Sequence, residues 1–139
     1  DNFELAESLL GRPYTFSGKV VHGQHLGRTI DIPTANIWIP KQKLPISGVY
    51  AVECKLEDTV YKGIANMGFR PTVGGTKPVL EVHIFEFNKN IYSKRLKVQF
   101  IKKIRDEKKF DNLDMLKLQI QKDISIAKKF LNKSNDKKL

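Results

Sequence analysis

Apolar and polar residues alternate along most of the first hundred residues, which is the pattern of half-buried β-strands. The alternating stretches are short and are separated by glycine, proline, asparagine or aspartate, the residues that favour turns. No stretch with a helical period lies between them, so we predict an antiparallel barrel or sandwich. The predicted strands span residues 14–21, 34–39, 48–56, 60–67, 79–87 and 95–104.

From Asp111 the pattern changes, because apolar residues recur at intervals of three and four, as on one face of a helix. These residues are Leu113, Leu116, Ile120, Ile124, Ala127 and Leu131. Asp111 or Asn112 is available as the N-cap. A shorter stretch with helical spacing predicts a lead-in helix within residues 1–13. We expect one domain, residues 14–132, in which the C-terminal helix packs against a closed barrel, and a frayed basic tail at 133–139.

The composition, with 40% hydrophobic and 29% charged residues among 139, is that of a soluble globular domain. No apolar stretch approaches the roughly 20 residues that span a bilayer, so we expect no membrane partner. The N-terminus does not resemble a signal peptide. Cys54 is the single cysteine, which fits a reducing compartment and predicts a cytoplasmic protein. Cys54 also has no neighbouring base and no metal-ligand spacing, which argues against a cysteine nucleophile or a zinc site.

The formal net charge is +10, and 12 basic against 6 acidic residues follow residue 101. Most of the surplus therefore belongs to the predicted helix and tail, where a solvated basic face is the simplest interpretation. A positive field would also speed the capture of a polyphosphate nucleotide. A barrel that binds single-stranded nucleic acid is an alternative function, but it needs cations and aromatic residues on one sheet face. We expect no nucleic-acid partner.

Two predicted strands carry polar residues on one face only. In the segment PTAN, Thr34 and Asn36 share a face while Ala35 lies on the other. A hydroxyl and an amide oxygen are suitable ligands for a hard cation such as Mg²⁺, although an edge strand begun by a proline would also place them in solvent. In the strand at 79–87, Glu81 and His83 lie opposite the apolar residues. Glu81 is either a solvated charge or a general base.

Glycines at 18, 23 and 27 lie close to Lys19 and Arg28, and exposed backbone N–H groups with cations are what a polyphosphate needs. The spacing matches neither the P-loop nor the dinucleotide fingerprint, so these glycines could equally be turn residues.

The segment NMGFRPTVGG, residues 66–75, contains an arginine before a proline and ends in two glycines. This composition predicts a loop that presents Arg70, or simply a long turn. Tyr92 either stacks on a planar ring or is a half-buried residue at the end of a strand.

Several motifs together resemble the riboflavin kinase family over nearly the whole chain. They are GKVVHGQHLGRTIDIPTANI, GVYAV, NMGFRPTVGG, LEVHIFEF and IYSKRLKVQFIKKIRDEKKFDNLDML. The combination of PTAN, GxRPT and a later E-x-H strand is the specific part of this resemblance. The stretch LLGRPYTFSGKVV most resembles the C-terminal kinase module of the bacterial bifunctional riboflavin kinase/FAD synthetase. The HxGH-type signature of the nucleotidyltransferase half does not occur in this sequence.

The resemblance implies a six-stranded Greek-key barrel with a C-terminal helix, and the transfer of the γ-phosphate of ATP to the ribityl 5′-hydroxyl of riboflavin, giving FMN and ADP. It implies Glu81 as the catalytic base, and Thr34 and Asn36 as ligands of Mg²⁺, with zinc and manganese left open. It further implies a kinase module that either belongs to a bifunctional parent protein, with an FAD synthetase domain preceding the kinase, or stands alone. The residues that it assigns to nucleotide and phosphate are Gly18, Lys19, Gly23, Gly27, Arg28, Pro33, Thr34, Asn36, His83 and Tyr92. Those that it assigns to the flavin are Arg70, Ile104, Arg105, Leu113 and Leu116.

The sequence departs from the family pattern at two positions, Asp31 and Ser93, where glycine is expected. Neither position carries an assigned chemical role. A barrel that binds a flavin without transferring phosphate is a further alternative. It would bind riboflavin but would form no FMN from ATP.

Overall fold

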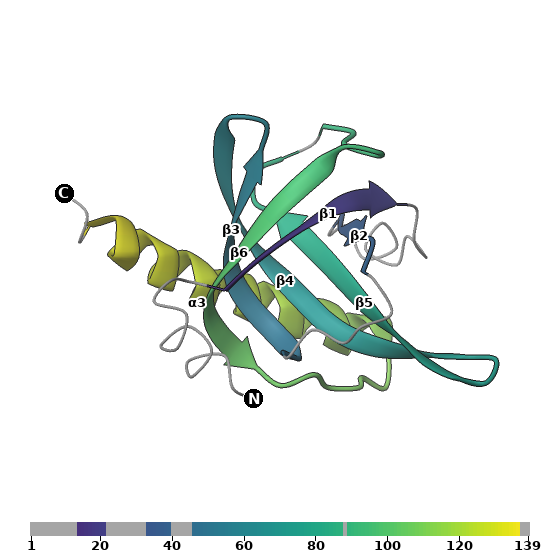
Figure 1. Cartoon of the computed structure of the whole chain (residues 1–139). Coiled ribbons are helices and arrows are strands. Elements are labelled where there is room, and N and C mark those ends of the chain that lie inside the picture. Colours follow the sequence, from purple (N-terminus) through teal and green to yellow (C-terminus); the bar gives the residue numbers. More distant parts are fainter. Residues whose placement is uncertain (1–13, 22–32, 40–45, 88, 137–139) are drawn as a thin grey trace.

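The computed structural model describes residues 14–21, 33–39, 46–87 and 89–136, which form six strands and one helix (Figure 1). The predicted lead-in helix at 1–13 lies outside these residues. The elements are β1 (Tyr14–Val21), β2 (Ala35–Ile37), β3 (Gly48–Leu56), β4 (Thr59–Thr72), β5 (Gly75–Ile84), β6 (Arg95–Arg105) and α3 (Leu113–Asp136). Three of the predicted strands match to within one residue, whereas β2 is shorter than predicted and the boundaries of β4 and β5 differ.

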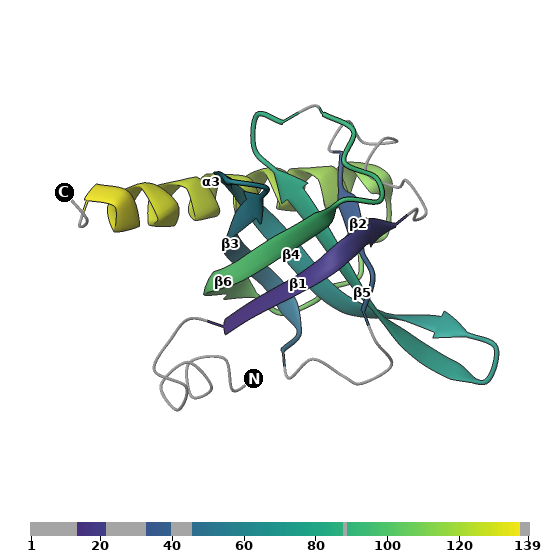
Figure 2. The ribbon, with the colours of Figure 1, turned by 45° about the horizontal axis from the view of Figure 1, so that its top comes forward.

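The six strands close into a barrel in the order β1-β2-β5-β4-β3-β6, and all neighbours are antiparallel. The hairpins join β3, β4 and β5 in sequence, and β6 returns to lie beside β3, which is the Greek-key arrangement. Figure 2 shows the strands that form the closed barrel, with α3 along one side. The predicted barrel with a C-terminal helix is therefore confirmed. Among the described residues, no helix is both long and apolar enough to cross a membrane.

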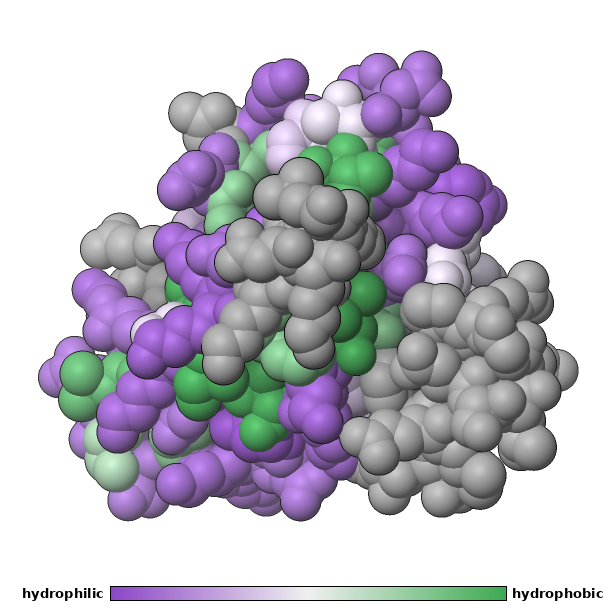
Figure 3. Space-filling view, turned by 90° about the vertical axis from the view of Figure 1, so that its left-hand side faces the viewer, coloured by the Kyte–Doolittle hydropathy of each residue, from purple (hydrophilic) through white to green (hydrophobic). Residues whose placement is uncertain are grey.

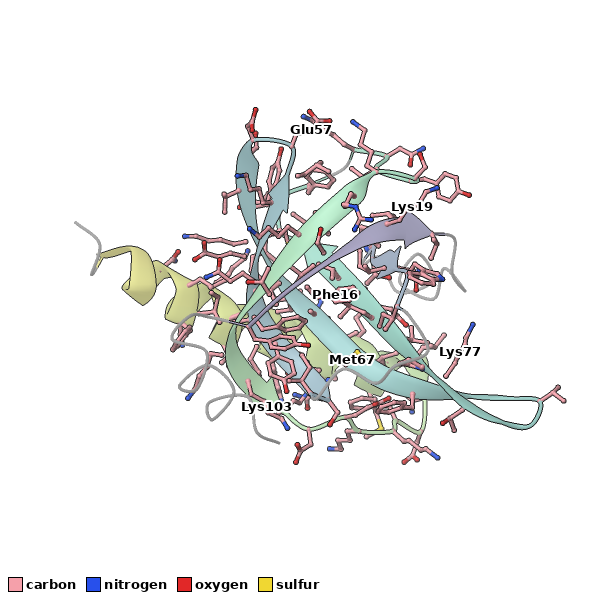
Figure 4. The ribbon with its side chains drawn as sticks, viewed as in Figure 1. Phe16, Lys19, Glu57, Met67, Lys77 and Lys103 are labelled. Carbon is pink, nitrogen blue, oxygen red and sulfur yellow. The ribbon has the colours of Figure 1, made fainter. Side chains whose placement is uncertain are left out.

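Alternate strand residues fill the interior of the barrel. The largest fully buried side chains there include Tyr50, Phe100, Met67 and Leu80, and the Tyr50 and Phe100 rings meet edge to face with centroids 5.3 Å apart. Figure 4 shows Met67 within the barrel, whereas Lys77 lies on the hairpin that leaves it. This single continuous core accounts for the alternating pattern of the sequence.

Cys54 lies in the barrel core with no exposed surface, and burial raises the pKa of its thiol to about 12. Since only the thiolate is nucleophilic, we expect Cys54 to resist alkylation by iodoacetamide at pH 8 in the folded protein. Labelling followed by mass spectrometry should detect modification only after urea unfolds the chain. Rapid labelling of the native protein at that pH would contradict the buried position of Cys54.

A second apolar cluster joins α3 to the outer face of the barrel. Ala51 of β3 and Ile64 of β4 pack against Ala127 and Leu131 of the helix. The partly buried residues around them are Phe85, Ile101, Ile104, Ile120 and Ile124. The helical period predicted this packing face. The helix continues to Asp136, beyond the predicted start of a frayed tail at 133, and residues 137–139 lie outside the described part. On the side toward which the C-terminal end of α3 points, hydrophilic side chains surround small hydrophobic patches (Figure 3).

Asn112 is the N-cap of α3, one of the two candidates from the sequence. Its Oδ1 accepts a hydrogen bond from the backbone N–H of Met115 at 2.9 Å. Replacing Asn112 with alanine removes this acceptor, so we expect the free energy of unfolding to fall by about 1 kcal/mol. Urea denaturation would measure the loss. Asp111→Ala is the matched control and should change stability by only a few tenths of a kcal/mol; equal effects of the two substitutions would contradict the capping assignment.

The loop expected at residues 66–75 is instead a β-hairpin, so that prediction was wrong. The strand β4 continues to Thr72 and pairs with β5, with Pro71 opposite Thr76. Residues of β4 beyond Met67 have no pairing with β3, so the hairpin leaves the barrel as a two-stranded ribbon (Figures 1 and 2). A proline is tolerated there because one edge of each strand needs no partner. Gly74, with φ of 88°, provides the turn.

The family departure at Ser93 has a conformational meaning. Ser93 has φ of 69°, in the left-handed region that glycine adopts without a steric penalty. Glycine at this position would therefore fit the backbone better. Asp31 lies outside the described residues.

Candidate active site

A cavity of about 620 Å³ lies between the outer face of the barrel and the start of α3. Its wall is formed by β3, β4 and β5, the end of β6, the segment 107–112 and the first turns of the helix. Six of the residues predicted from the sequence line this one cavity: Thr34, Glu81, His83, Arg105, Leu113 and Leu116. Thr34 and Glu81, which are 47 positions apart in the sequence, therefore line the same cavity.

Strand pairing explains why distant residues meet there. Asn36 of β2 pairs with Glu81 of β5, and Glu81 pairs on its other side with Asn66 of β4. Asn66 pairs in turn with Val49 of β3, which pairs with Arg105 of β6. Residues opposite one another in adjacent strands point to the same face of a sheet. The five residues consequently form one row across the outer face of the barrel.

His83 fixes the segment that leads into β2. Its Nδ1 lies 2.7 Å from the backbone carbonyl oxygen of Pro33, and because a carbonyl only accepts, Nδ1 carries the hydrogen and donates it. This bond holds the backbone next to Thr34 against β5. His83 and Thr34 thus lie together at one end of the cavity, with His83 positioned to orient the PTAN segment.

Arg105 lines the cavity, and its guanidinium is engaged with the helix. Its Nε and Nη2 donate to the carboxylate of Asp123 at 2.8 to 3.0 Å, and the amide of Gln119 donates to the same carboxylate at 3.0 Å. Asp123 is only 1% exposed. Arg105 Nη1 also donates to the Asp106 carbonyl at 3.1 Å. This ion pair joins the end of β6 to α3, and both of its residues line the cavity.

Apolar side chains of the segment 107–112 and of α3 also line the cavity, among charged residues that include Lys108 and Lys109. Phe110 lies over Arg105, with the guanidinium carbon 5.7 Å from the ring centroid, and Leu113, Leu116 and Ile120 continue the wall along the helix. The carboxylate of Glu107 lies against Gly68 of β4, and a Cβ atom at position 68 would overlap this carboxylate. The cavity therefore brings apolar side chains that can receive a planar ring together with the polar groups of Thr34, His83 and Glu81.

Several cavity residues were not predicted individually: Asn66, Phe69, Glu107, Phe110 and Asp123. Two of these residues interrupt the apolar pattern of the sequence. Asn66 interrupts an otherwise apolar run in the sequence IANMG, and Asp123 falls on the apolar face of the helix between Ile120 and Ala127. A polar residue at a position where the pattern calls for an apolar one often marks a site.

The other predicted residues lie elsewhere or outside the described part. Gly18, Lys19, Pro33, Asn36, Ile104 and Tyr92 are described but do not line the cavity. Gly18 is buried, and a Cβ there would lie 2.6 Å from Ile37 Cγ2, so steric packing explains the glycine. Ile104 packs under α3. The residues Gly23, Gly27 and Arg28 lie outside the described part of the chain. Of Arg70 only the backbone is described, opposite Lys77.

Oxygen donors make up the candidate metal site. Thr34 lines the cavity, and strand pairing places Asn36, two residues further on, opposite Glu81, although Asn36 itself does not line the cavity. Within the described residues, no group of three or more His, Cys, Asp or Glu side chains could by itself hold a metal ion. A few neutral oxygens and one carboxylate fit a hard cation that keeps waters and shares phosphate oxygens, the usual habit of Mg²⁺.

This fold and site define a small β-barrel with a cavity between its outer face and a C-terminal helix. The riboflavin kinase family model matches residues 10–131. The bifunctional riboflavin kinase/FMN adenylyltransferase of Haemophilus influenzae is 52% identical over 133 residues, which cover 95% of this chain and 43% of that protein. The chain therefore belongs to the riboflavin kinase family, and it spans less than half the length of this relative.

Solved structures agree with the fold. A riboflavin kinase from Trypanosoma brucei matches with a TM-score of 0.63 and 26% identity, covering 87% of this chain and 81% of that one. A protein from Streptococcus pneumoniae titled a macrolide-efflux protein matches with a TM-score of 0.79 and 39% identity, covering 88% of this chain and 40% of that one.

Proposed function

We propose that this chain transfers the γ-phosphate of ATP to the ribityl 5′-hydroxyl of riboflavin, giving FMN and ADP. The observation that carries the proposal is the single cavity that brings Thr34 and Glu81 together with the apolar residues Phe110, Leu113 and Leu116. Its volume, about 620 Å³, is within the usual range for small-molecule sites. The isoalloxazine ring would lie against these apolar residues and the ribityl chain would extend toward Glu81.

Phosphoryl transfer depends mainly on alignment and on neutralising charge. Glu81, fixed on β5 between two other strands, would accept the proton of the 5′-hydroxyl as that oxygen attacks the γ-phosphorus. The His83 contact to Pro33 would hold Thr34 beside it. Thr34 and Asn36 would hold the Mg²⁺ that accompanies the nucleotide, and this cation would supply positive charge at the phosphate oxygens. Of the residues between 18 and 28 that were assigned to the nucleotide, Gly18 and Lys19 lie in strand β1, and the others lie outside the described residues.

The proposal is tested by incubating the protein with riboflavin, ATP and Mg²⁺ and separating the flavins by chromatography. Formation of FMN that requires all three components is the expected result. Riboflavin binding without FMN formation would contradict the transferase and favour a flavin-binding barrel. The relative from Haemophilus influenzae is named as an FMN adenylyltransferase as well as a riboflavin kinase. We propose that such a domain in the parent protein would consume the FMN formed here.

Thr34→Ala should raise the Mg²⁺ concentration needed for half-maximal rate by about tenfold, because one ligand oxygen, worth about 1.4 kcal/mol, is lost. The side chain is off the barrel core, so the melting temperature should not change. Steady-state rates over a Mg²⁺ series would measure the shift. Thr76→Ala, on the exposed hairpin, is the matched control. An unchanged Mg²⁺ dependence for Thr34→Ala would show that Thr34 is not a ligand.

A further inference from the structure

Asn66 carries a buried polar atom that the described residues do not satisfy. Its Oδ1 is shielded from solvent and has no hydrogen-bond partner among them. Buried polar side-chain atoms are nearly always paired, and an exception in a native structure calls for an explanation. Asn66 also lines the cavity that contains Glu81. A ligand in this cavity is therefore the natural partner for the oxygen.

The position of Asn66 limits what that partner can be. Asn36, Glu81 and Asn66 lie opposite one another on three adjacent strands, and neighbouring strands are spaced about 4.8 Å apart. Glu81 is the middle residue of the three. The PTAN segment lies on one side of it, and Asn66, followed by Val49 and Arg105, lies on the other. A substrate that places its phosphate acceptor at Glu81 and its ring near Phe110 must pass Asn66.

The chemistry of the amide selects the group that lies there. An amide oxygen accepts a hydrogen bond, so it pairs with a donor and not with a phosphate oxygen, which is itself an acceptor. The ribityl chain carries secondary hydroxyls between the 5′ end and the ring, and each of these can donate. We infer that Asn66 is a specificity-determining residue that accepts a hydrogen bond from a secondary ribityl hydroxyl and so selects a polyhydroxylated chain. This inference rests on the proposed function, because it takes riboflavin as the ligand.

The test compares riboflavin with an isoalloxazine that carries a 5-hydroxypentyl chain at N10, which keeps the terminal hydroxyl but lacks the secondary ones. Dissociation constants are measured by flavin fluorescence quenching in the presence of Mg-ADP, and FMN formation is measured by chromatography. In Asn66→Ala we expect riboflavin binding to weaken about 10-fold, because a buried hydrogen bond is lost. Binding of the hydroxypentyl analogue should change by less than about twofold, so that the preference for riboflavin largely disappears.

Two further variants keep the inference open to refutation. Asn66→Val removes the same polar atoms with a side chain suited to a strand, and it should show the same loss of preference even if Asn66→Ala folds poorly. Asn132→Ala, which replaces an exposed asparagine outside the cavity wall, should leave the preference unchanged. If the ratio of the dissociation constants for the two flavins is the same in both Asn66 variants as in the unsubstituted chain, the inference is wrong. FMN formation by the unsubstituted chain, measured in the same assay, decides separately whether the proposed function stands.

Discussion

Glu81→Gln is expected to lower kcat by about 10² to 10⁴-fold, which is the usual contribution of a general base. The amide has nearly the shape of the carboxylate but cannot accept the proton of the attacking hydroxyl. Glu81 lies on the outer face of β5, between Leu80 and Val82, which are both buried in the barrel, so the substitution should leave the core intact. The KM for riboflavin should change much less than kcat, because the role belongs to the transition state.

The measurement is FMN formation from riboflavin and ATP at saturating Mg²⁺, together with a thermal melt of each variant. Glu86→Gln is the matched control, because Glu86 lies in the turn after the same strand and is exposed. The Glu86→Gln variant should keep the activity of the unsubstituted chain. If Glu81→Gln retains more than about a tenth of the parent kcat while folding normally, Glu81 is not the base, and the reaction proceeds with alignment and charge neutralisation alone.

Asp123→Ala is expected to lower the free energy of unfolding by about 3 kcal/mol, at the lower end of the cost of breaking a buried ion pair. The carboxylate of Asp123 is 1% exposed and accepts three hydrogen bonds from Arg105 and one from Gln119. Its loss leaves the guanidinium of Arg105, whose side chain is only 19% exposed, without its main partner. The partial exposure of Arg105 lets water compensate in part.

Urea denaturation would measure this loss, and Asp106→Ala is the matched control. Asp106 pairs with Lys103 at 2.7 Å but its side chain is 88% exposed, so its replacement should cost less than about 1 kcal/mol. The double variant Arg105→Met with Asp123→Leu removes both charges and should be more stable than Asp123→Ala. Similar losses for Asp123→Ala and Asp106→Ala would show that the ion pair does not stabilise the fold.

The same ion pair shows where prediction from the sequence stopped. Arg105 was expected on the flavin side of the site, and it does line the cavity, but the structure engages its guanidinium with Asp123. The two residues are 18 positions apart, on a strand and a helix, so no local pattern relates them. The hairpin at 66–75 was missed for a related reason. Glycine and proline usually end strands, but here each strand of the ribbon needs only one partner, so the pairing tolerates them.

Local patterning was enough to predict the type and order of the elements, although not every boundary, because alternation with period two and recurrence with period 3.6 are local consequences of which side of a backbone is buried. It therefore predicted the barrel strands, the helix, and the shared faces of Thr34 with Asn36 and of Glu81 with His83. Which faces meet became visible only in the folded barrel. Strand order and register place Asn36, Glu81 and Asn66 in one row, and the packing of α3 over the barrel leaves a cavity that Glu81 and Asn66 line. Such pairings depend on contacts between residues far apart in the chain, which no local spacing encodes.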